Sequence, residues 1–113
     1  LITDAIAAAG LEPGRYQLGG LDVDVQNGAA RLAGTDTLAG STLTMMDAFR
    51  YAVKQIGLDV PEASRLASSN PARLLGLDEQ TGSIAPGKQA DLLLISPELE
   101  LQRVWVEGRT VLG

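Results

Sequence analysis

The chain has 113 residues, with nine basic against fourteen acidic side chains and a net charge of −5. This balance argues against a nucleic-acid partner, which needs clustered Lys and Arg, and no apolar run approaches the ~20 residues that span a membrane. Histidine and cysteine are absent, so a Ser-His-Asp triad and a disulfide are excluded within the chain, and a zinc site would have to use carboxylates alone. The lack of cysteine is compatible with a reducing cytoplasm, where we expect the protein to work.

The first residues predict the end of a buried strand. Leu1 and Ile2 are apolar, and they lead through Thr3 into an acid, Asp4. In α/β barrels the C-terminal ends of the strands carry the catalytic side chains, which makes Asp4 a candidate. This pattern alone favours the catalytic role of Asp4 no more than a structural one, in which Asp4 caps a loop or accepts hydrogen bonds from backbone amides. Because the chain opens inside an element, we expect it to be part of a larger enzyme.

A β-hairpin is predicted next. Apolar and polar side chains alternate over residues 15–18 and 21–26, which is the period of half-buried strands. Asn27-Gly28 is a strong signal for a two-residue turn, and residues 29–33 would return as the partner strand. Residues 34–41 are expected to form a loop.

Helices follow this loop. Apolar side chains recur every three or four positions over residues 42–56, and Gly57 is placed to end that helix. A second helix is predicted over residues 61–68. Asn70 is expected to cap a short third helix that Gly76 ends.

The last third of the chain changes to strands. Residues 90–96 form a continuous apolar run with an acid near its start, which is typical of a well-buried strand. Residues 101–106 alternate, and residues 109–112 would pair back after a turn at Glu107-Gly108. Lys88 lies in a turn and is expected to be solvated. Together the elements predict an α/β protein.

At this point the sequence resembles a known family. Residues 82–92 (GSIAPGKQADL) and residues 105–109 (WVEGR) resemble the C-terminal strands of the amidohydrolase superfamily, and residues 69–72 (SNPA) before them fit the same superfamily. Residues 1–5 (LITDA) and 37–45 (TLAGSTLTM) narrow this to a resemblance to the N-acetylglucosamine-6-phosphate deacetylase family. The resemblance covers essentially the whole chain, and its two narrower motifs agree in order and spacing.

The resemblance implies a fold and a division of the chain. The fold would be the C-terminal part of a (β/α)8 barrel with strands of a small β-sandwich. Residues 1–77 would end the barrel with its last strand, the hairpin insertion and the closing helices, and residues 78–113 would supply the sandwich strands. The partners implied are the remaining N-terminal part of the same protein and further copies of it in a homo-oligomer.

The resemblance also implies a site. Asp4 matches the family's general base and acid, which takes a proton from the attacking water and gives one to the leaving amine. Leu38, Ala39 and Gly40 match a segment that contacts the sugar phosphate largely through its backbone, and Gly40 permits close approach. The alternative for this segment is an ordinary loop before a helix, with Ser41, Thr42 or Thr44 as the helix cap.

The activity implied is the metal-dependent hydrolysis of N-acetylglucosamine 6-phosphate to glucosamine 6-phosphate and acetate. The cofactor would be a divalent metal ion, zinc or iron, with Asp4 beside it and the ligands outside this segment. Two alternatives stay open: another amidohydrolase, such as a cyclic amidohydrolase or a deaminase, and a non-catalytic α+β module. The module is favoured if these residues are the whole molecule, because they lack the family's metal-binding Glu and His.

Overall fold

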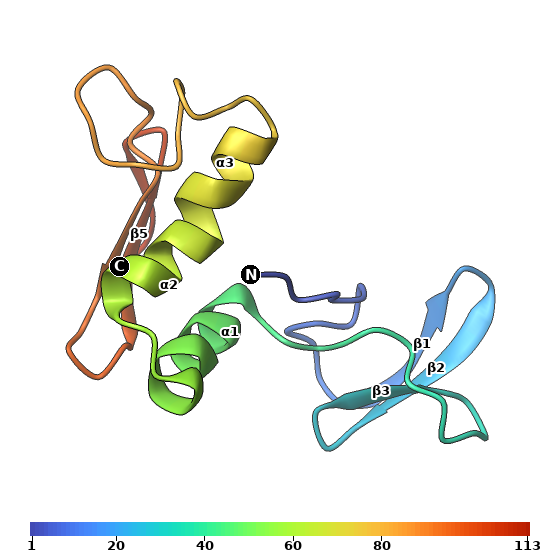
Figure 1. Ribbon diagram of the computed structural model, residues 1–113. Coiled ribbons are helices and arrows are strands. Elements are labelled where there is room, and N and C mark those ends of the chain that lie inside the picture. Colours follow the sequence, from blue (N-terminus) through green and yellow to red (C-terminus); the bar gives the residue numbers. More distant parts are fainter. The chain divides into compact units, whose positions relative to one another are not determined.

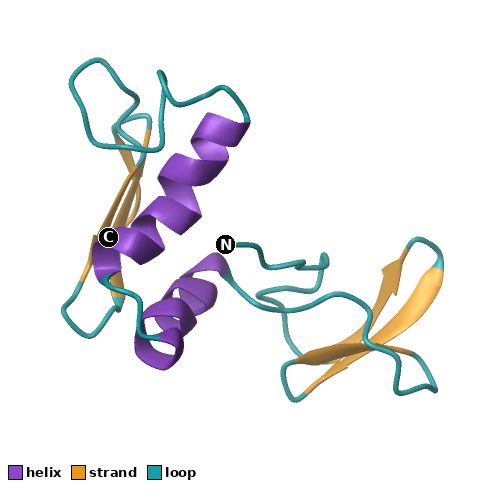
Figure 2. Ribbon diagram, in the orientation of Figure 1, coloured by secondary structure: helices purple, strands orange, loops and turns teal.

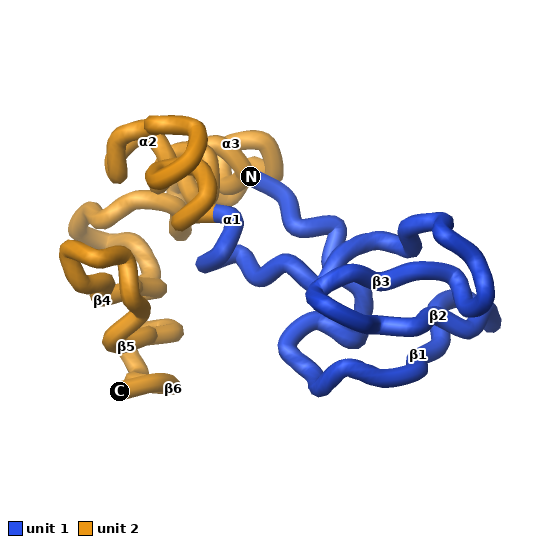
Figure 3. Tube along the Cα trace, turned by 90° about the horizontal axis from the view of Figure 1, so that it is seen from below, with its two compact units in different colours: residues 1–48 blue, residues 49–113 orange.

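The computed structural model describes residues 1–113, which form two compact units, residues 1–48 and residues 49–113 (Figures 1 and 3). Each unit contains one three-stranded antiparallel sheet, and most of the helical residues belong to the second unit (Figure 2). The structure is therefore α/β with small sheets. The predicted division at residue 77 into barrel and sandwich parts stays a prediction.

The sheet of the first unit confirms the predicted hairpin. Its strands are β1 (Gly14–Leu18), β2 (Leu21–Gln26) and β3 (Ala29–Leu32), paired in the order β1-β2-β3. Asn27 and Gly28 form the turn between β2 and β3 with φ values of 52° and 74°. Two successive positive φ values match the right-handed twist of a tight hairpin, which explains why Asn-Gly is favoured there.

The core of the first unit lies on one face of this sheet. Val23 and Val25 point inward from alternate positions of β2 and are 0% and 4% exposed. Alanines complete the cluster, and three larger side chains pack against it while partly exposed. The buried alanines are Ala8, Ala30 and Ala39, and the packed side chains are Ile6, Tyr16 and Leu32. The core thus draws on the residues after Asp4 as well as on the sheet.

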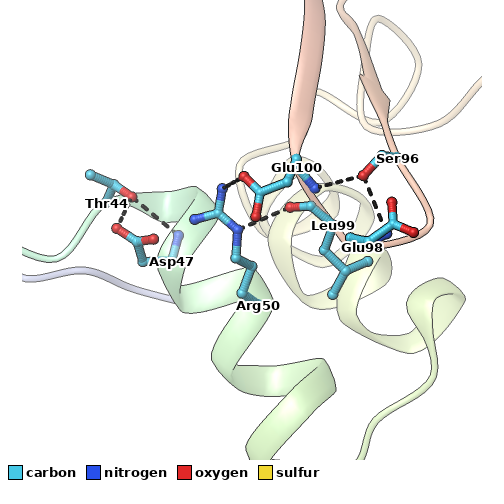
Figure 4. Close-up of polar contacts among 7 residues, drawn as sticks. All are labelled: Thr44, Asp47, Arg50, Ser96, Glu98, Leu99 and Glu100. Atoms are coloured by element: carbon cyan, nitrogen blue, oxygen red, sulfur yellow. Dashed lines mark hydrogen bonds and ion pairs between the residues drawn. The ribbon is translucent and has the colours of Figure 1, made fainter.

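The first helix begins later than predicted. α1 spans Met45–Tyr51 and continues as a π-helical segment, η1 (Ala52–Ile56), which ends at left-handed Gly57 as expected. The start shifts from residue 42 because Thr44 caps the helix. Its hydroxyl accepts the Asp47 N–H at 3.1 Å and donates to the Asp47 carboxylate at 2.7 Å (Figure 4). This reciprocal pair satisfies a donor that the helix itself leaves free.

The next two predicted helices are one continuous helical run. It comprises α2 (Val60–Ser64), η2 (Arg65–Ser69) and α3 (Asn70–Leu74) without a break. The predicted cap at Asn70 is wrong, because Asn70 has helical backbone angles of −68° and −48°. The cap that exists is Asp59, which forms a capping box with Glu62.

The sheet of the second unit contains β4 (Leu92–Ile95), β5 (Leu101–Val106) and β6 (Arg109–Leu112) in that order. The three strands confirm the predicted order of elements. The prediction that residues 90–96 are well buried is wrong within this chain, because Leu93 is 61% exposed. No helix in the structure has the length and apolar character needed to cross a membrane.

The loop before β4 is held by side chains. Lys88, predicted to be solvated, instead donates from Nζ to the Asp78 carbonyl and to the Ser83 hydroxyl. Ser69 donates to the Gly82 carbonyl at 2.6 Å, which fastens the loop to the helical run. These contacts give the loop a defined path that the sequence pattern did not predict.

Candidate functional site

Asp4 lies beside the segment that contains the other predicted site residues. Ala5 and Ser41 form a parallel bridge in which the Ser41 N–H donates to the Asp4 carbonyl at 2.8 Å. The Ile6 N–H then donates to the Ser41 carbonyl at 2.9 Å. The fold of the first unit therefore brings the two predicted parts of the site together, although they are far apart in the sequence.

The other edge of the same segment pairs with β3. The Leu32 N–H donates to the Thr37 carbonyl at 2.9 Å, and the Ala39 N–H donates to the Ala30 carbonyl at 3.0 Å. Leu38 stands opposite Arg31 in an antiparallel bridge. Residues 37–41 were predicted as part of a loop, but they form a short extended segment. Its first residues are hydrogen-bonded to β3, and Ser41 is hydrogen-bonded to Asp4 and Ile6. The sequence did not indicate this because both partners are distant along the chain.

Gly40 lies between Ala39, which is hydrogen-bonded to β3, and Ser41, which is hydrogen-bonded to Asp4. It has a φ of 71°, and a Cβ atom at this position would lie 2.6 Å from Ile6 Cγ2 and 3.0 Å from the Asp4 carbonyl oxygen. The same atom would be 3.9 Å from Asp4 Oδ2. Only glycine fits here, because a side chain would meet both a left-handed backbone and the residues around Asp4. Gly40 thus allows close packing against Ile6 and the Asp4 backbone, whereas the expected close approach of a sugar phosphate stays a prediction.

The three predicted contact residues differ in what they expose. The Leu38 side chain is 64% exposed, whereas Ala39 is 7% exposed and belongs to the core of the unit. The Ala39 N–H already donates to β3, but the N–H groups of Leu38 and Gly40 have no hydrogen-bond partner in the chain. A ligand beside this segment would therefore meet the backbone of Leu38 and Gly40, and Ala39 would support them from behind.

Asp4 has an exposed side chain and a left-handed backbone, with a φ of 51°. The predicted buried strand before it does not form. Ile2 is 83% exposed, and pairing is limited to the single bridge at Ala5. Aspartate is among the few side chains that tolerate positive φ, so the conformation of Asp4 is unusual without being forbidden.

A charged pair lies on the sheet of the first unit, outside the candidate site. Arg15 and Asp24 make a two-pronged contact across β1 and β2, at 2.7 and 2.9 Å. The hydrogen bond from Arg15 lowers the pKa of the exposed Asp24 carboxyl, and the same contact raises the pKa of Arg15. This pair fastens the edge strand and has no contact with Asp4.

The residues of this chain do not form a metal site by themselves. No group of three or more His, Cys, Asp or Glu side chains comes together in the structure. Asp4 is the only carboxylate among the predicted site residues, and one carboxylate does not make the four-ligand set typical of zinc.

Comparison with known proteins identifies the family, because the model of the amidohydrolase family matches residues 21–111. The chain belongs to the amidohydrolase family. This family is generally metal-dependent, and the structure leaves the identity of the metal open.

The relatives are named as amino-sugar deacetylases. The chain is 43% identical over 96% of its length to a putative N-acetylgalactosamine-6-phosphate deacetylase of Escherichia coli K12, and 36% identical over 98% to the N-acetylglucosamine-6-phosphate deacetylase of Vibrio furnissii. A solved N-acetyl-D-glucosamine-6-phosphate deacetylase of Mycobacterium smegmatis, an Asp-to-Ala mutant in complex with N-acetyl-D-glucosamine-6-phosphate, is 46% identical over 99% of the chain with a TM-score of 0.86. The chain spans 65%, 28% and 30% of these proteins, respectively.

Sequence reasoning missed one residue of this region. Ser41 was interpreted as a helix cap, but its hydroxyl donates to the Thr3 carbonyl at 2.5 Å and accepts the Leu43 N–H at 3.1 Å. The helix begins four positions later, at Met45. No local signal distinguishes a serine that caps a helix from one that fastens a distant segment.

Proposed function

We propose that this chain is the C-terminal part of a sugar-phosphate N-deacetylase that converts N-acetylglucosamine 6-phosphate and water to glucosamine 6-phosphate and acetate. The observation that carries the proposal is that the backbone pairing of Asp4 and Ala5 with Ser41 places Asp4 beside the segment of residues 38–40, in a chain whose relatives are named as deacetylases of this kind. In this proposal residues 1–77 end a (β/α)8 barrel and residues 78–113 are strands of a small β-sandwich.

Asp4 is the general base and then the general acid. Its exposed carboxylate takes a proton from the water that attacks the acetyl carbon. When the carbon–nitrogen bond breaks, the protonated carboxyl gives that proton to the leaving nitrogen, and the products are acetic acid and the free amine, which ionise to acetate and the protonated amine. A positioned carboxylate in this role contributes about 10²- to 10⁴-fold to the rate.

Leu38 and Gly40 bind the sugar phosphate through their backbones. Their N–H groups have no partner in the chain, so each offers a donor to a phosphate or hydroxyl oxygen. Ala39 keeps the segment in place from the core, where it is 7% exposed. The absence of a Cβ atom at Gly40 lets this segment pack directly against Ile6 and the Asp4 backbone.

The rest of the site belongs to other parts of the protein. The cofactor is a divalent metal ion, zinc or iron, and its ligands lie mainly outside this segment, because the residues here form no metal cluster. We further propose that the protein works in the cytoplasm as a homo-oligomer, in amino-sugar catabolism. The cyclic amidohydrolase, the deaminase and the non-catalytic module are less favoured, because the relatives described above are named as deacetylases.

The test is acetate release from N-acetylglucosamine 6-phosphate by the complete protein with a divalent metal. Asp4→Asn is expected to lower turnover by about 100-fold or more, because the amide neither takes nor gives the proton. Asp36→Asn is a matched control in the same unit, since the Asp36 side chain is exposed and has no hydrogen bond to residues 3–6. Near-normal turnover by a folded Asp4→Asn protein would remove Asp4 from the mechanism.

A second substrate, N-acetylgalactosamine 6-phosphate, is suggested by the name of the relative that is 43% identical. The two sugars differ only in the configuration at C4, and the backbone donors of Leu38 and Gly40 do not decide between them. Comparing kcat/KM for the two sugar phosphates on the same preparation assigns the preference. We expect N-acetylglucosamine 6-phosphate to be the better substrate, and a higher kcat/KM for the other sugar would reassign the enzyme.

A further inference from the structure

Ser41 is hydrogen-bonded to Asp4 and to residues on both sides of it. The hydroxyl donates to the Thr3 carbonyl at 2.5 Å, and the N–H donates to the Asp4 carbonyl at 2.8 Å. The Ser41 carbonyl accepts the Ile6 N–H at 2.9 Å. Three contacts from one residue therefore fix the chain before and after the Asp4 side chain.

The direction of the Asp4 carboxylate depends on this backbone. Asp4 has a φ of 51°, a left-handed conformation that aspartate tolerates but that the surrounding contacts must favour. No side-chain hydrogen bond within the chain holds the carboxylate. Within the chain, the Ser41 contacts therefore fix the backbone of Asp4 and with it the direction of the Cα–Cβ bond from which the carboxylate extends.

The Ser41 hydroxyl acts as donor and acceptor at once. It donates to Thr3 and accepts the Leu43 N–H at 3.1 Å. An alanine at this position would lose both contacts while the backbone bonds to Asp4 and Ile6 remain. A threonine would keep the hydroxyl and both contacts.

We propose that Ser41 is a positioning residue that holds the carboxylate of Asp4 in its productive orientation for deacetylation. This inference rests on the proposed function. It assigns the hydroxyl a role in the chemical step, through Asp4, and no contact with the substrate. A small displacement of a catalytic group is sufficient to slow the chemical step strongly.

The test compares three variants of the complete, metal-loaded protein with N-acetylglucosamine 6-phosphate. Ser41→Ala is expected to lower kcat by about tenfold with KM changed by less than about twofold, and Ser41→Thr is expected to restore kcat. Thr42→Val is the matched control. The Thr42 hydroxyl donates to the Gly28 carbonyl at 2.9 Å and has no hydrogen bond to residues 3–6, so its loss leaves kcat unchanged.

Each other outcome overturns the proposal. A normal kcat in Ser41→Ala, a loss that Ser41→Thr does not restore, or an equal loss in Thr42→Val would each contradict a positioning role. A Ser41→Ala protein that does not fold would also contradict it, because the hydroxyl would then hold the unit itself. Two further measurements in the same assay separate the hypotheses. Absence of turnover by the wild-type, metal-loaded protein ends the proposed function, and full turnover by Asp4→Asn ends the roles of Asp4 and Ser41. An inactive Asp4→Asn beside a normal Ser41→Ala ends only the role of Ser41.

Discussion

In the first unit, residues 1–48, the segment of the candidate site is paired on both sides by backbone hydrogen bonds, whereas in the second unit, residues 49–113, long side chains add to the backbone bonds that hold the loops. In the first unit, residues 37–41 pair with β3 on one side and with Asp4 and Ile6 on the other. In the second, Arg50, Ser69 and Lys88 each donate to the carbonyl of a distant loop residue.

The buried residues differ in the same way. Those of the first unit form a cluster around Val23 and Val25 of the sheet. Those of the second unit are three small alanines and Leu99, and large side chains such as Leu74 and Ile84 are 86% and 89% exposed. The comparison teaches that the first unit ties its core directly to the site. Substitutions beside the site in the first unit should therefore lower both kcat and the free energy of unfolding. Substitutions in the second unit should lower the free energy of unfolding and leave kcat unchanged.

The largest effect is expected from Gly40→Ala. The new Cβ atom would lie 2.6 Å from Ile6 Cγ2, and the φ of 71° adds backbone strain. Gly34→Ala is the matched control, because Gly34 has a φ of 73° but a Cβ atom there would meet nothing within 4 Å. We expect Gly40→Ala to lower the free energy of unfolding by about 1–3 kcal/mol more than the control, and to lower kcat. Urea unfolding measures the free energy, and acetate release measures kcat. Equal effects of Gly40→Ala and Gly34→Ala would contradict the close contact between Gly40 and Ile6.

Gly82→Ala makes the same change in the second unit. Its Cβ atom would lie 2.5 Å from Ala72 Cβ at a φ of 86°, whereas Gly87, with a φ of 88°, has nothing within 4 Å. We expect Gly82→Ala to lower the free energy of unfolding by about 1–3 kcal/mol relative to Gly87→Ala, without the loss of kcat that Gly40→Ala causes. A folded Gly82→Ala protein with lowered kcat would break the comparison between the units.

Arg50→Met removes a side chain that fastens a turn. Arg50 donates from Nε to the Leu99 carbonyl at 2.9 Å and pairs with Glu100 at 3.2 Å (Figure 4). Leu99 is buried with a φ of 68°, so this contact supports a strained residue. We expect the free energy of unfolding to fall by about 1–2 kcal/mol in urea titrations. Arg103→Met, which removes a cation 5.7 Å from the Trp105 ring, is the control and should have less effect. An equal loss of unfolding free energy in Arg50→Met and Arg103→Met would contradict the role of Arg50 in stabilising the turn at Leu99.

The smallest effect is expected from Asp24→Asn, because its ion pair with Arg15 is exposed. The pKa of Asp24 is lowered in the folded protein by the hydrogen bond from Arg15. The pair therefore stabilises the fold above the ordinary carboxyl pKa, and this contribution disappears as the pH falls through the lowered value. Urea midpoints of wild type and Asp24→Asn should differ slightly at neutral pH and converge in acid. A difference that grows in acid would contradict this assignment.

Local features of the fold could be predicted from the sequence, and distant pairings could not. Asn27-Gly28 and Gly57 act through their own backbone angles, so their turn and helix end were predicted correctly. The extended segment at residues 37–41 was not predicted, because the residues to which it is hydrogen-bonded are distant in the sequence. Alternation of side chains indicates a strand but not the strand with which it pairs. Asn70 was wrongly predicted to cap a helix. The preceding helical segment, η2, continues directly into α3 at Asn70, so no new helix begins there and no cap is needed.

The candidate site was predictable in part for the same reason. Asp4 and Gly40 were selected by their resemblance to family motifs, and the structure places them together. Ser41 was taken for a cap, since a hydroxyl before a helix is most often one. Its actual partner, Thr3, is 38 positions away. Their roles in the reaction stay predictions until activity is measured.

The most direct test of this account is a crystal structure of the complete protein carrying Asp4→Asn, with N-acetylglucosamine 6-phosphate bound. The account predicts that the residue 4 side chain lies within hydrogen-bond distance of the acetamido group, and that the backbones of Leu38 and Gly40 contact the sugar phosphate. A bound sugar phosphate that touches neither residue 4 nor residues 38–40 would contradict it.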